Sequence, residues 1–312
     1  MKNGRNKTIR LTVEEGQSYL NRCVELSGPA ELGAILDKTI HGDALAVLPL
    51  LPHEFVDLLI VDPPYNLDKD FHGAAFQQMP EAEYEAYTER WLLAALPLLK
   101  PDASVYVCCD WRSTPAVTRV LRKHCIVRNR ITWQREKGRG ARANWKNGME
   151  DILFATVSDV YTFRLDAVKL RRRVLAPYRR DGRPKDWEET ADGNFRNTCP
   201  SNFWDDITVP YWSMAENTPH PTQKPEKLLA KLILASSAPG DVVLDPFLGS
   251  GSTSVTAKKL KRRFVGIEQN SQYCVWAEKR LEAAESAPAI QGYEDGVFWE
   301  RNSRPRKGVC FS

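Results

Sequence analysis

The stretch DVVLDPFLGSGST, residues 241–253, decides the fold. It consists of an apolar run that ends in Asp245, a turn of small residues, and the start of GSTSVTAKKL (251–260), which has helical spacing. Gly249 and Gly251 allow the backbone to turn tightly and to approach a ligand where a Cβ atom would clash. A glycine turn that opens a helix also offers N–H groups to polar or anionic parts of a ligand. The stretch predicts a strand–turn–helix unit that binds a ligand.

Similar units occur on both sides of this stretch. Short apolar runs bounded by turn residues predict three further strands, at residues 56–62, 103–109 and 262–268. Helical spacing alternates with them at residues 81–99, 225–236 and 271–285. Alternating strands and helices predict an α/β fold, with a parallel sheet that is covered by helices on both faces.

An acid ends the strand that follows the glycine turn, as Glu268 in FVGIE (264–268). An acid about 20 residues beyond such a turn commonly binds the hydroxyls of a ribose. The turn lacks the lysine of a phosphate-binding P-loop, and its glycines do not have G-x-G-x-x-G spacing. Turn and acid together indicate a nucleoside cofactor, and a plain tight turn remains the alternative.

A second ligand loop is predicted at IVDPPYN (60–66). Asp62 lies at the carboxyl end of a predicted strand, where open α/β sheets bind ligands. Pro63 and Pro64 have no N–H and a fixed φ angle, so they stiffen the turn and leave carbonyl groups as acceptors. With the flat ring of Tyr65 beside them, these acceptors suit a planar group that donates hydrogen bonds, namely an aromatic amine. The alternative is a diproline turn with a surface tyrosine.

Positive charge is concentrated in the middle of the chain. Residues 112–185 contain 20 Lys and Arg against 6 Asp and Glu, a net charge of +14, while the rest contains 24 bases and 34 acids, a net charge of −10. Two apolar runs in this region are joined by a basic loop at 135–148, and residues 160–217 are rich in arginine and aromatic residues. A basic face on an acidic body indicates a polyanionic partner, and we interpret 160–217 as an inserted recognition lobe.

Several classes of protein are excluded. No apolar run approaches the roughly 20 residues that span a bilayer, and the N-terminus has no apolar core of a secretory signal. The seven cysteines are scattered, with Cys108 and Cys109 adjacent, which fits neither a disulfide framework nor the spacing of metal ligands. We therefore expect a reduced, cytoplasmic protein with no membrane association and no metal site.

Three motifs in order resemble a known family. DPPYN (62–66), HPTQKPEKL (220–228) and DPFLGSGST (245–253) are similar to the motifs of the S-adenosylmethionine-dependent amino-methyltransferases of DNA. Their order, with the catalytic motif first, resembles the permuted β class, and the resemblance covers about residues 38–285. It implies a Rossmann-like class I methyltransferase sheet with helices on both faces, circularly permuted, with an inserted target-recognition region.

The resemblance also implies a division of the chain. We expect an N-terminal extension (1–35), the catalytic half of the methyltransferase domain (36–159), the target-recognition region (160–217), the cofactor-binding half (218–285) and a C-terminal tail (286–312) that is at most partly ordered.

Roles for individual residues follow from the resemblance. The implied catalytic residues are those of the tetrapeptide, Asp62, Pro63, Pro64 and Tyr65. Asp62 and the Pro63 carbonyl would hold the target amino group, and Tyr65 would stack on a base flipped out of the duplex. The implied binding set for S-adenosylmethionine comprises Asp43, Asp62, Thr222, Lys224, Asp245, Phe247, Gly249, Ser250, Gly251, Ser252 and Glu268.

Within that set, Glu268 would bind the ribose and Asp43 the adenine. Thr222 and Lys224 would reach the carboxylate of the cofactor, and the glycine turn would line its methionine part. The expected DNA-binding residues are Arg135, Lys137, Arg139, Arg142, Arg171, Arg172 and Arg173. The sequence does not divide the last three between phosphate contacts and base reading.

The resulting hypothesis is a site-specific DNA methyltransferase that methylates N6 of adenine in duplex DNA by base flipping and direct displacement. The alternative is N4 of cytosine, although those enzymes more often have serine in place of Asp62. C5 methylation of cytosine needs a cysteine after a proline, and Cys199-Pro200 has the opposite order. An NAD-dependent oxidoreductase leaves DPPYN unexplained, and a plain DNA-binding module leaves the glycine loop unexplained. A cognate restriction endonuclease, a homodimer and the DNA recognition sequence remain open.

Overall fold

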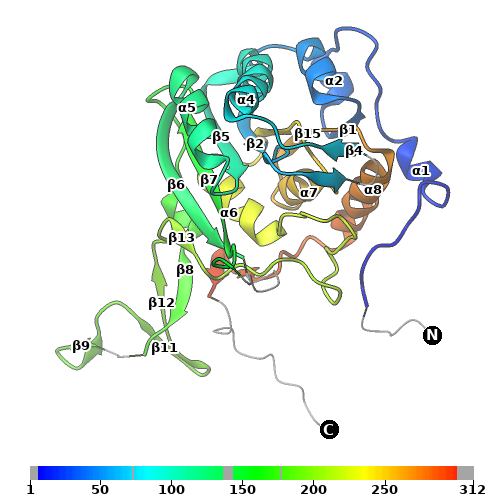
Figure 1. Ribbon diagram of the computed structural model, residues 1–312. Helices are drawn as coiled ribbons and strands as arrows, with labels where there is room; N and C mark the ends of the chain where they lie inside the picture. Colours follow the sequence, from blue (N-terminus) through cyan, green and yellow to red (C-terminus); the bar gives the residue numbers. More distant parts are fainter. Residues whose placement is uncertain (1–5, 72–73, 136–142, 176–177, 301–312) are drawn as a thin grey trace.

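The computed structural model describes residues 6–71, 74–135, 143–175 and 178–300. Across these residues, a large mixed sheet of eight strands forms the centre of the molecule (Figure 1). In spatial order its strands are β1 (Lys38–His41), β15 (Arg263–Glu268), β14 (Val242–Asp245), β2 (Val56–Val61), β5 (Leu99–Cys109), β7 (Met149–Thr156), β6 (Ile126–Gln134) and β13 (Phe203–Trp204). Strand β14, near the middle of the sheet, ends at Asp245 of the stretch DVVLDPFLGSGST (241–253).

One strand departs from the predicted parallel arrangement. Strands β1, β15, β14, β2 and β5 are parallel to one another, whereas β7 is antiparallel to both β5 and β6. The prediction of a wholly parallel sheet is therefore wrong. Strands β6 and β7 are joined directly by the basic loop, and a direct connection of this kind produces antiparallel neighbours. As a result, β7 begins at the edge of the sheet where the parallel strands end.

The predicted strands and helices are otherwise confirmed, with small changes at their ends. The main helices are α4 (Glu81–Ala95), α5 (Thr114–His124), α6 (Glu226–Ser236), α7 (Ser252–Lys259) and α8 (Ser271–Ser286). The helix predicted to reach residue 99 ends at Ala95, and a 3₁₀ turn that contains Pro97, η2 (Leu96–Leu98), follows it. Proline favours a helix boundary because it lacks the N–H that an α-helix requires.

Helices cover both faces of the sheet. Side chains alternate along β2, so Leu59 packs in the same core as Trp91 of α4, while Leu58 packs with Leu232 of α6. The first core also contains the short elements α2 (Leu32–Ile35), α3 (Ala44–Val47) and η1 (Leu48–Leu50). The second core lies under α6, α7 and α8, and α1 (Gln17–Leu20) packs against α8.

A smaller sheet extends away from this body at the lower left of Figure 1. Its strands, in spatial order, are β11 (Glu188–Thr190), β12 (Gly193–Thr198), β8 (Leu170–Arg173), β17 (Val297–Trp299) and β16 (Tyr293–Glu294). Two short hairpins, β3 (Lys69–Phe71) with β4 (Ala74–Phe76) and β9 (Arg179–Arg180) with β10 (Arg183–Pro184), and the 3₁₀ turn η3 (Leu165–Val168) complete the structure.

The described part of the C-terminal tail contributes β16 and β17 to this smaller sheet. We expected at most partial order after residue 286, and the structure describes the tail up to Glu300. Strand β17 is parallel to β8, and Phe298 is fully buried in a core shared with Leu170 of β8 and Ala230 of α6. The tail therefore fastens the smaller sheet to the main body.

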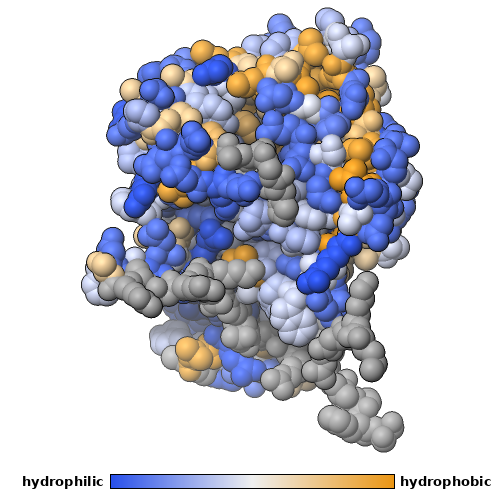
Figure 2. All heavy atoms as spheres, turned by 45° about the vertical axis from the view of Figure 1, so that its right-hand side comes forward, coloured by the Kyte–Doolittle hydropathy of each residue, from blue (hydrophilic) through white to orange (hydrophobic). Residues whose placement is uncertain are grey.

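The face of the molecule in Figure 2 is mostly hydrophilic, with apolar residues gathered mainly in its upper part. Within the described ranges, no helix has both the length and the apolar character needed to cross a membrane.

Replacing Phe298 with alanine tests the role of the tail. Because the ring is completely buried, we expect Phe298→Ala to lower the free energy of unfolding by about 3–5 kcal/mol in urea denaturation. The control is Phe203→Ala, since that ring is 52% exposed, and its expected loss is within about 0.5 kcal/mol. Equal losses in the two variants would contradict the fastening role of β17.

Candidate active site

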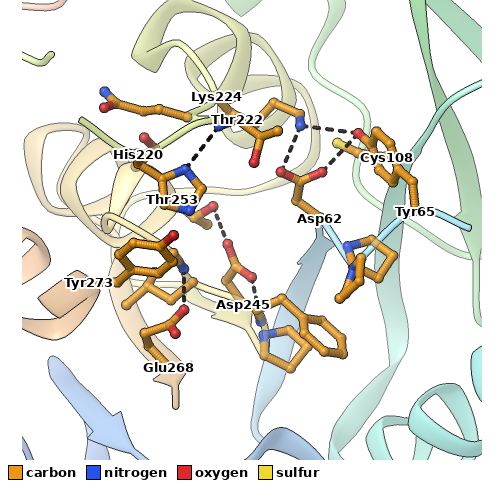
Figure 3. A pocket seen from close by; sticks show the side chains of 18 of the residues that line it. Asp62, Tyr65, Cys108, His220, Thr222, Lys224, Asp245, Thr253, Glu268 and Tyr273 are labelled. Atoms are coloured by element: carbon orange, nitrogen blue, oxygen red, sulfur yellow. Dashed lines mark hydrogen bonds and ion pairs between the residues drawn. The ribbon is translucent and has the colours of Figure 1, made fainter. Parts of the chain in front are cut away.

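A cavity of about 430 Å³ lies at the carboxyl ends of β2, β14 and β15. The two ligand loops predicted from the sequence both line it, although they are far apart in the chain (Figure 3). They meet because β2 and β14 are hydrogen-bonded neighbours, with Leu58 opposite Val243. Of the residues assigned to catalysis and to the cofactor, the cavity wall includes Asp43, Asp62, Pro63, Pro64, Tyr65, Thr222, Lys224, Asp245, Phe247, Gly249, Ser250, Ser252 and Glu268.

A cluster of charged groups surrounds Asp62. The Lys224 ammonium donates to Asp62 Oδ2 at 2.6 Å and to the Tyr65 hydroxyl at 3.1 Å, and it lies 3.3 Å from Glu150 Oε2. The Tyr65 hydroxyl donates to Asp62 Oδ1 at 2.9 Å. Arg135 forms an ion pair with Oε1 of Glu150. These two acids and two bases balance one another, and Lys69, which also lines the cavity, lies close enough to interact electrostatically with all four.

Burial and neighbouring charge act in opposite directions on Lys224. Burial alone would lower the pKa of its ammonium, but the carboxylates of Asp62 and Glu150 outweigh burial and hold that pKa above its usual value. Burial, supported by the same two carboxylates, raises the pKa of the Tyr65 hydroxyl. Burial also raises the pKa of the nearby Cys108 thiol. At neutral pH, Lys224 is therefore charged while Tyr65 and Cys108 are neutral.

The diproline turn is held by contacts on its outer side. The Tyr84 hydroxyl donates to the Pro64 carbonyl at 3.1 Å. Asn66, for which the sequence indicated no role, exchanges two hydrogen bonds with the backbone of Met79, both 2.8 Å long. Its own N–H donates to Ser113 Oγ at 3.2 Å. Asn66 therefore ties the end of the catalytic turn to the chain that leads into α4 and to the N-terminus of α5.

The glycine turn has the predicted backbone geometry. Gly249 and Gly251 have φ angles of +56° and +85°, which side chains rarely permit. A Cβ atom on Gly251 would lie 2.7 Å from Cα of Ala277, so this glycine allows the turn to pack closely on α8. A Cβ atom on Gly249 would lie 3.0 Å from Nε2 of His220 on the cavity wall.

The expectation of free N–H groups in this turn is wrong for four of its residues. The N–H of Phe247 donates to Asp245 Oδ1 at 3.0 Å, and that of Gly249 donates to Glu268 Oε2 at 2.8 Å. The N–H of Gly251 donates to the Leu248 carbonyl at 3.1 Å, and the N–H of Leu248 donates to the Ile267 carbonyl at 2.9 Å. The two acids that end β14 and β15 accept the first two of these bonds, so those N–H groups shape the turn.

The acids that end β14 and β15 are both buried. Burial raises the pKa of Asp245 to about 7, against the hydrogen bonds from Thr253 and the Phe247 N–H, which lower it. Burial also raises the pKa of Glu268 to about 7, although the N–H groups of Asn270 and Gly249 lower it. A ligand group that donates a hydrogen bond to either carboxylate would lower its pKa and favour its charged form. Ribose hydroxyls and amines are ligand groups of this kind.

The remaining residues assigned to the cofactor shape the cavity in different ways. Asp43 accepts a hydrogen bond from the Ala46 N–H at 3.1 Å and thereby caps α3. The carbonyl of Ser250 and the hydroxyl of Ser252 both accept from buried Arg280 of α8, at 2.7 and 2.9 Å. The ring of Phe247 meets Trp91 edge to face.

The residues assigned to DNA divide into three groups. Arg135, whose side chain is 27% exposed, lines the cavity, where it pairs with Glu150. Arg171 contacts Glu188 at 2.9 Å and Asn197 at 3.1 Å, while Arg172 pairs with Glu300 at 3.4 Å and Arg173 donates to the Asp192 carbonyl at 3.2 Å. The third group, Lys137, Arg139 and Arg142, lies outside the described residues.

Sequence reasoning missed several residues of the cavity wall, including Glu150, Cys108, Trp111, His220 and Tyr273. For Glu150 a signal was present, because MEDILFATV places two acids in an otherwise apolar strand. A buried carboxylate is costly unless a cation or donor pairs with it. The pattern alone did not indicate which acid faces the cavity.

The mixed α/β sheet and the cavity at its edge define a methyltransferase fold. The crystal structure of an M1.HpyAVI–SAM complex matches this structure with a TM-score of 0.51 and 24% sequence identity, over 78% of this chain and 98% of that one.

The family model described as "DNA methylase" matches residues 56–279, more than two thirds of the chain. The chain therefore belongs to the N6/N4 DNA methylase family. It is 37% identical to "DNA adenine methyltransferase YhdJ" of Escherichia coli K12, over 82% of this chain and 86% of that protein. It is 32% identical to "Type II methyltransferase M.HpaI" of Haemophilus parainfluenzae, over 79% of this chain and 74% of that protein.

The raised pKa of Asp245 predicts how stability depends on pH. An acid with a raised pKa binds its proton more tightly in the folded protein, so the stability it contributes is complete below about pH 4 and is lost as the pH rises through 7. The amide of Asp245→Asn cannot ionise, so this variant avoids the free-energy cost of a buried charge at pH 8. We therefore expect its Tm to exceed that of the wild type at pH 8, by about 2–4 °C for each kcal/mol of that cost. Differential scanning calorimetry at pH 5 and 8 checks this. A gain as large at pH 5 as at pH 8 would contradict it.

Proposed function

We propose that this DNA methylase transfers the methyl group of S-adenosylmethionine to N6 of adenine in duplex DNA. One observation carries the proposal: the Asp62-Pro-Pro-Tyr65 turn and the glycine turn with Glu268 line the same cavity. An acceptor-rich turn for an aromatic amine therefore lies beside a turn suited to a nucleoside cofactor. The adenine assignment is further supported by the 37% identity to a protein named as an adenine methyltransferase and by the aspartate at position 62.

The cavity suits S-adenosylmethionine in size and in chemistry. Its volume of about 430 Å³ falls in the range typical of small-molecule sites. Glu268 would accept from the ribose hydroxyls, Asp43 would meet the adenine, and Asp245 with Phe247 would line the methionine part. Thr222 and Lys224 are the residues we assign to its carboxylate. When bound, this cofactor supplies a methyl group that its sulfonium charge has already activated.

The residues of the catalytic turn would prepare the target nitrogen. The lone pair of an exocyclic amine is delocalised into the ring, so the amine is a weak nucleophile. Asp62 and the Pro63 carbonyl would accept its two hydrogens and favour a pyramidal nitrogen whose lone pair points away from the ring. This is positioning combined with fixed electrostatic stabilisation. The nitrogen becomes strongly acidic only after methylation, and Asp62 would accept the proton that it then loses.

The target base would have to leave the duplex to reach this turn. Flipping a base costs a few kcal/mol, and stacking on the Tyr65 ring would return about 1–3 kcal/mol. Most of the sequence-independent affinity would come from basic residues that neutralise phosphates. The net charge of +14 over residues 112–185 supports that assignment.

We also propose the domain organisation that the motif order implies. It comprises an N-terminal extension (1–35), a catalytic half (36–159), a target-recognition region (160–217), a cofactor-binding half (218–285) and a tail (286–312), in a circularly permuted class I arrangement. The late position of β14 in the chain and the projecting smaller sheet support it (Figure 1). A restriction endonuclease partner, a homodimer and a cytoplasmic location remain predictions.

The product of the reaction tests the proposed function directly. Duplex plasmid DNA is incubated with the protein and S-adenosylmethionine labelled in its methyl group, then digested to nucleosides and separated by chromatography. We expect label in N6-methyl-2′-deoxyadenosine. Label in N4-methylcytosine would overturn the adenine assignment, and label in RNA or protein alone would overturn the choice of DNA as substrate.

Removal of the Asp62 carboxylate tests its catalytic role. Because it is the charged acceptor for the target amine, we expect Asp62→Ala to reduce methyl transfer by at least about 10²–10³-fold. Binding of S-adenosylmethionine, measured by calorimetry, should largely survive. The control is Asp159→Ala, an exposed acid that pairs with Arg128 outside the cavity and should retain activity. Loss of cofactor binding in Asp62→Ala would contradict this catalytic role and show that Asp62 acts mainly in the cofactor site.

A further inference from the structure

Both oxygens of the Asp62 carboxylate already have donors. Oδ1 accepts from the Tyr65 hydroxyl at 2.9 Å, and Oδ2 accepts from Lys224 Nζ at 2.6 Å. Each oxygen keeps a second lone pair that can accept from the target amine. The ammonium and the hydroxyl nevertheless offset much of the negative charge of this carboxylate, so Asp62 becomes a stronger acceptor for the amine when one of these donors moves to another acceptor. That acceptor must lie close by, because a charged group left without a partner in a buried site is costly.

One atom is placed to accept from both donors. Oε2 of Glu150 lies 3.3 Å from Lys224 Nζ and 3.4 Å from the Tyr65 hydroxyl. The distances from Nζ to the two carboxylates, 2.6 Å to Asp62 and 3.3 Å to Glu150, differ by only 0.7 Å. A small rotation of the lysine chain would therefore exchange one partner for the other.

The surroundings of Glu150 orient its carboxylate towards Lys224 and Tyr65. It is the second residue of β7, and because β7 is antiparallel to β5, its first residues reach the cavity edge. The carboxylate is 4% exposed, and its Oε1 is occupied by Arg135. Its other oxygen is thereby fixed towards Lys224 and Tyr65. The four charged side chains balance, so moving the ammonium between the two acids leaves the net charge of the cluster unchanged.

We propose that Glu150 is a positioning residue, which takes over the hydrogen bonds of Lys224 and Tyr65 and thereby frees Asp62 to accept the target amine. This inference rests on the proposed methyl transfer to an amine. It assigns Glu150 no proton transfer and no contact with the reacting atoms. A purely structural role would require only its ion pair with Arg135, and would not link Glu150 to the rate of the chemical step.

The test is the single-turnover rate constant of methyl transfer in Glu150→Gln, measured with saturating labelled S-adenosylmethionine and duplex DNA. The amide keeps the shape of the side chain but removes its charge, so Lys224 stays on Asp62. A lost hydrogen bond to a charged group predicts a rate about 10- to 100-fold lower. The dissociation constants for S-adenosylmethionine and for DNA should change by less than about threefold. Glu150 is assigned to neither ligand, and Lys224, which is assigned to the cofactor carboxylate, keeps its charge and its contact with Asp62 in this variant.

The matched control is Asp151→Asn, an equally buried acid on the same strand. Asp151 accepts from Thr114 and Thr132 and does not line the cavity. Its replacement should lower Tm without lowering the single-turnover rate constant. A second check is the Tyr65→Phe background, which removes one of the two donors. In that background we expect Glu150→Gln to lower the single-turnover rate constant by a smaller factor than in the wild type. The reason is that Tyr65 and Glu150 act in the same rearrangement of hydrogen bonds.

Where Glu150→Gln does not fold, Glu150→Asp decides, because it keeps the charge but withdraws the acceptor by one methylene. We expect Glu150→Asp to be slower than the wild type with unchanged ligand binding. A wild-type rate in either folded variant overturns the proposal, and so does a loss of rate matched by an equal loss of cofactor affinity. If the wild-type protein transfers no methyl group to DNA, the proposed function itself is refuted, and the role of Glu150 falls with it.

Discussion

The architecture of the site depends on one buried ammonium group, that of Lys224. It lies among Asp62, Tyr65 and Glu150, residues that come from β7 and from the turn after β2. Taking a lysine out of water is expensive, and only carboxylates in contact with it compensate for that loss. Because Lys224 is 162 residues from Asp62 in the sequence, this single group joins the HPTQKP segment to the catalytic turn. All four of these side chains line the cavity, so this contact fixes one part of its wall.

The order of the strands determines which side chains can meet. Strands β2 and β14 are neighbours, so the residues that follow them share one edge of the sheet, although residues 62–241 separate them in the chain. Strand β7 contributes to the same edge from the opposite direction. A carboxylate at its beginning therefore reaches the site from a part of the sequence that has no ligand motif of its own. Sheet topology, more than motif content, decides the membership of the site.

The sequence predicted the local features well. The strands, the main helices and both ligand loops follow from spacing that is visible within about 20 residues, because hydrophobic periodicity and glycine turns act locally. Three features were not predictable in this way. The partners of the glycine-turn N–H groups depend on Glu268 across the turn, and the place of Arg135 on the cavity wall depends on its contact with Glu150. The pairing of β17 with β8 joins short strands more than 120 residues apart, without any repeating pattern.

The position of β14 also determines when this protein can fold. During synthesis β2 and β5 leave the ribosome early, but β14, which pairs with β2, follows only after more than 130 further residues. Until then the unpaired edge of β2 is an exposed row of backbone donors and acceptors. The smaller sheet is completed later still, because β8 pairs with β17, which comprises residues 297–299. The large sheet therefore cannot be completed before Glu268 has left the ribosome, nor the smaller sheet before Trp299.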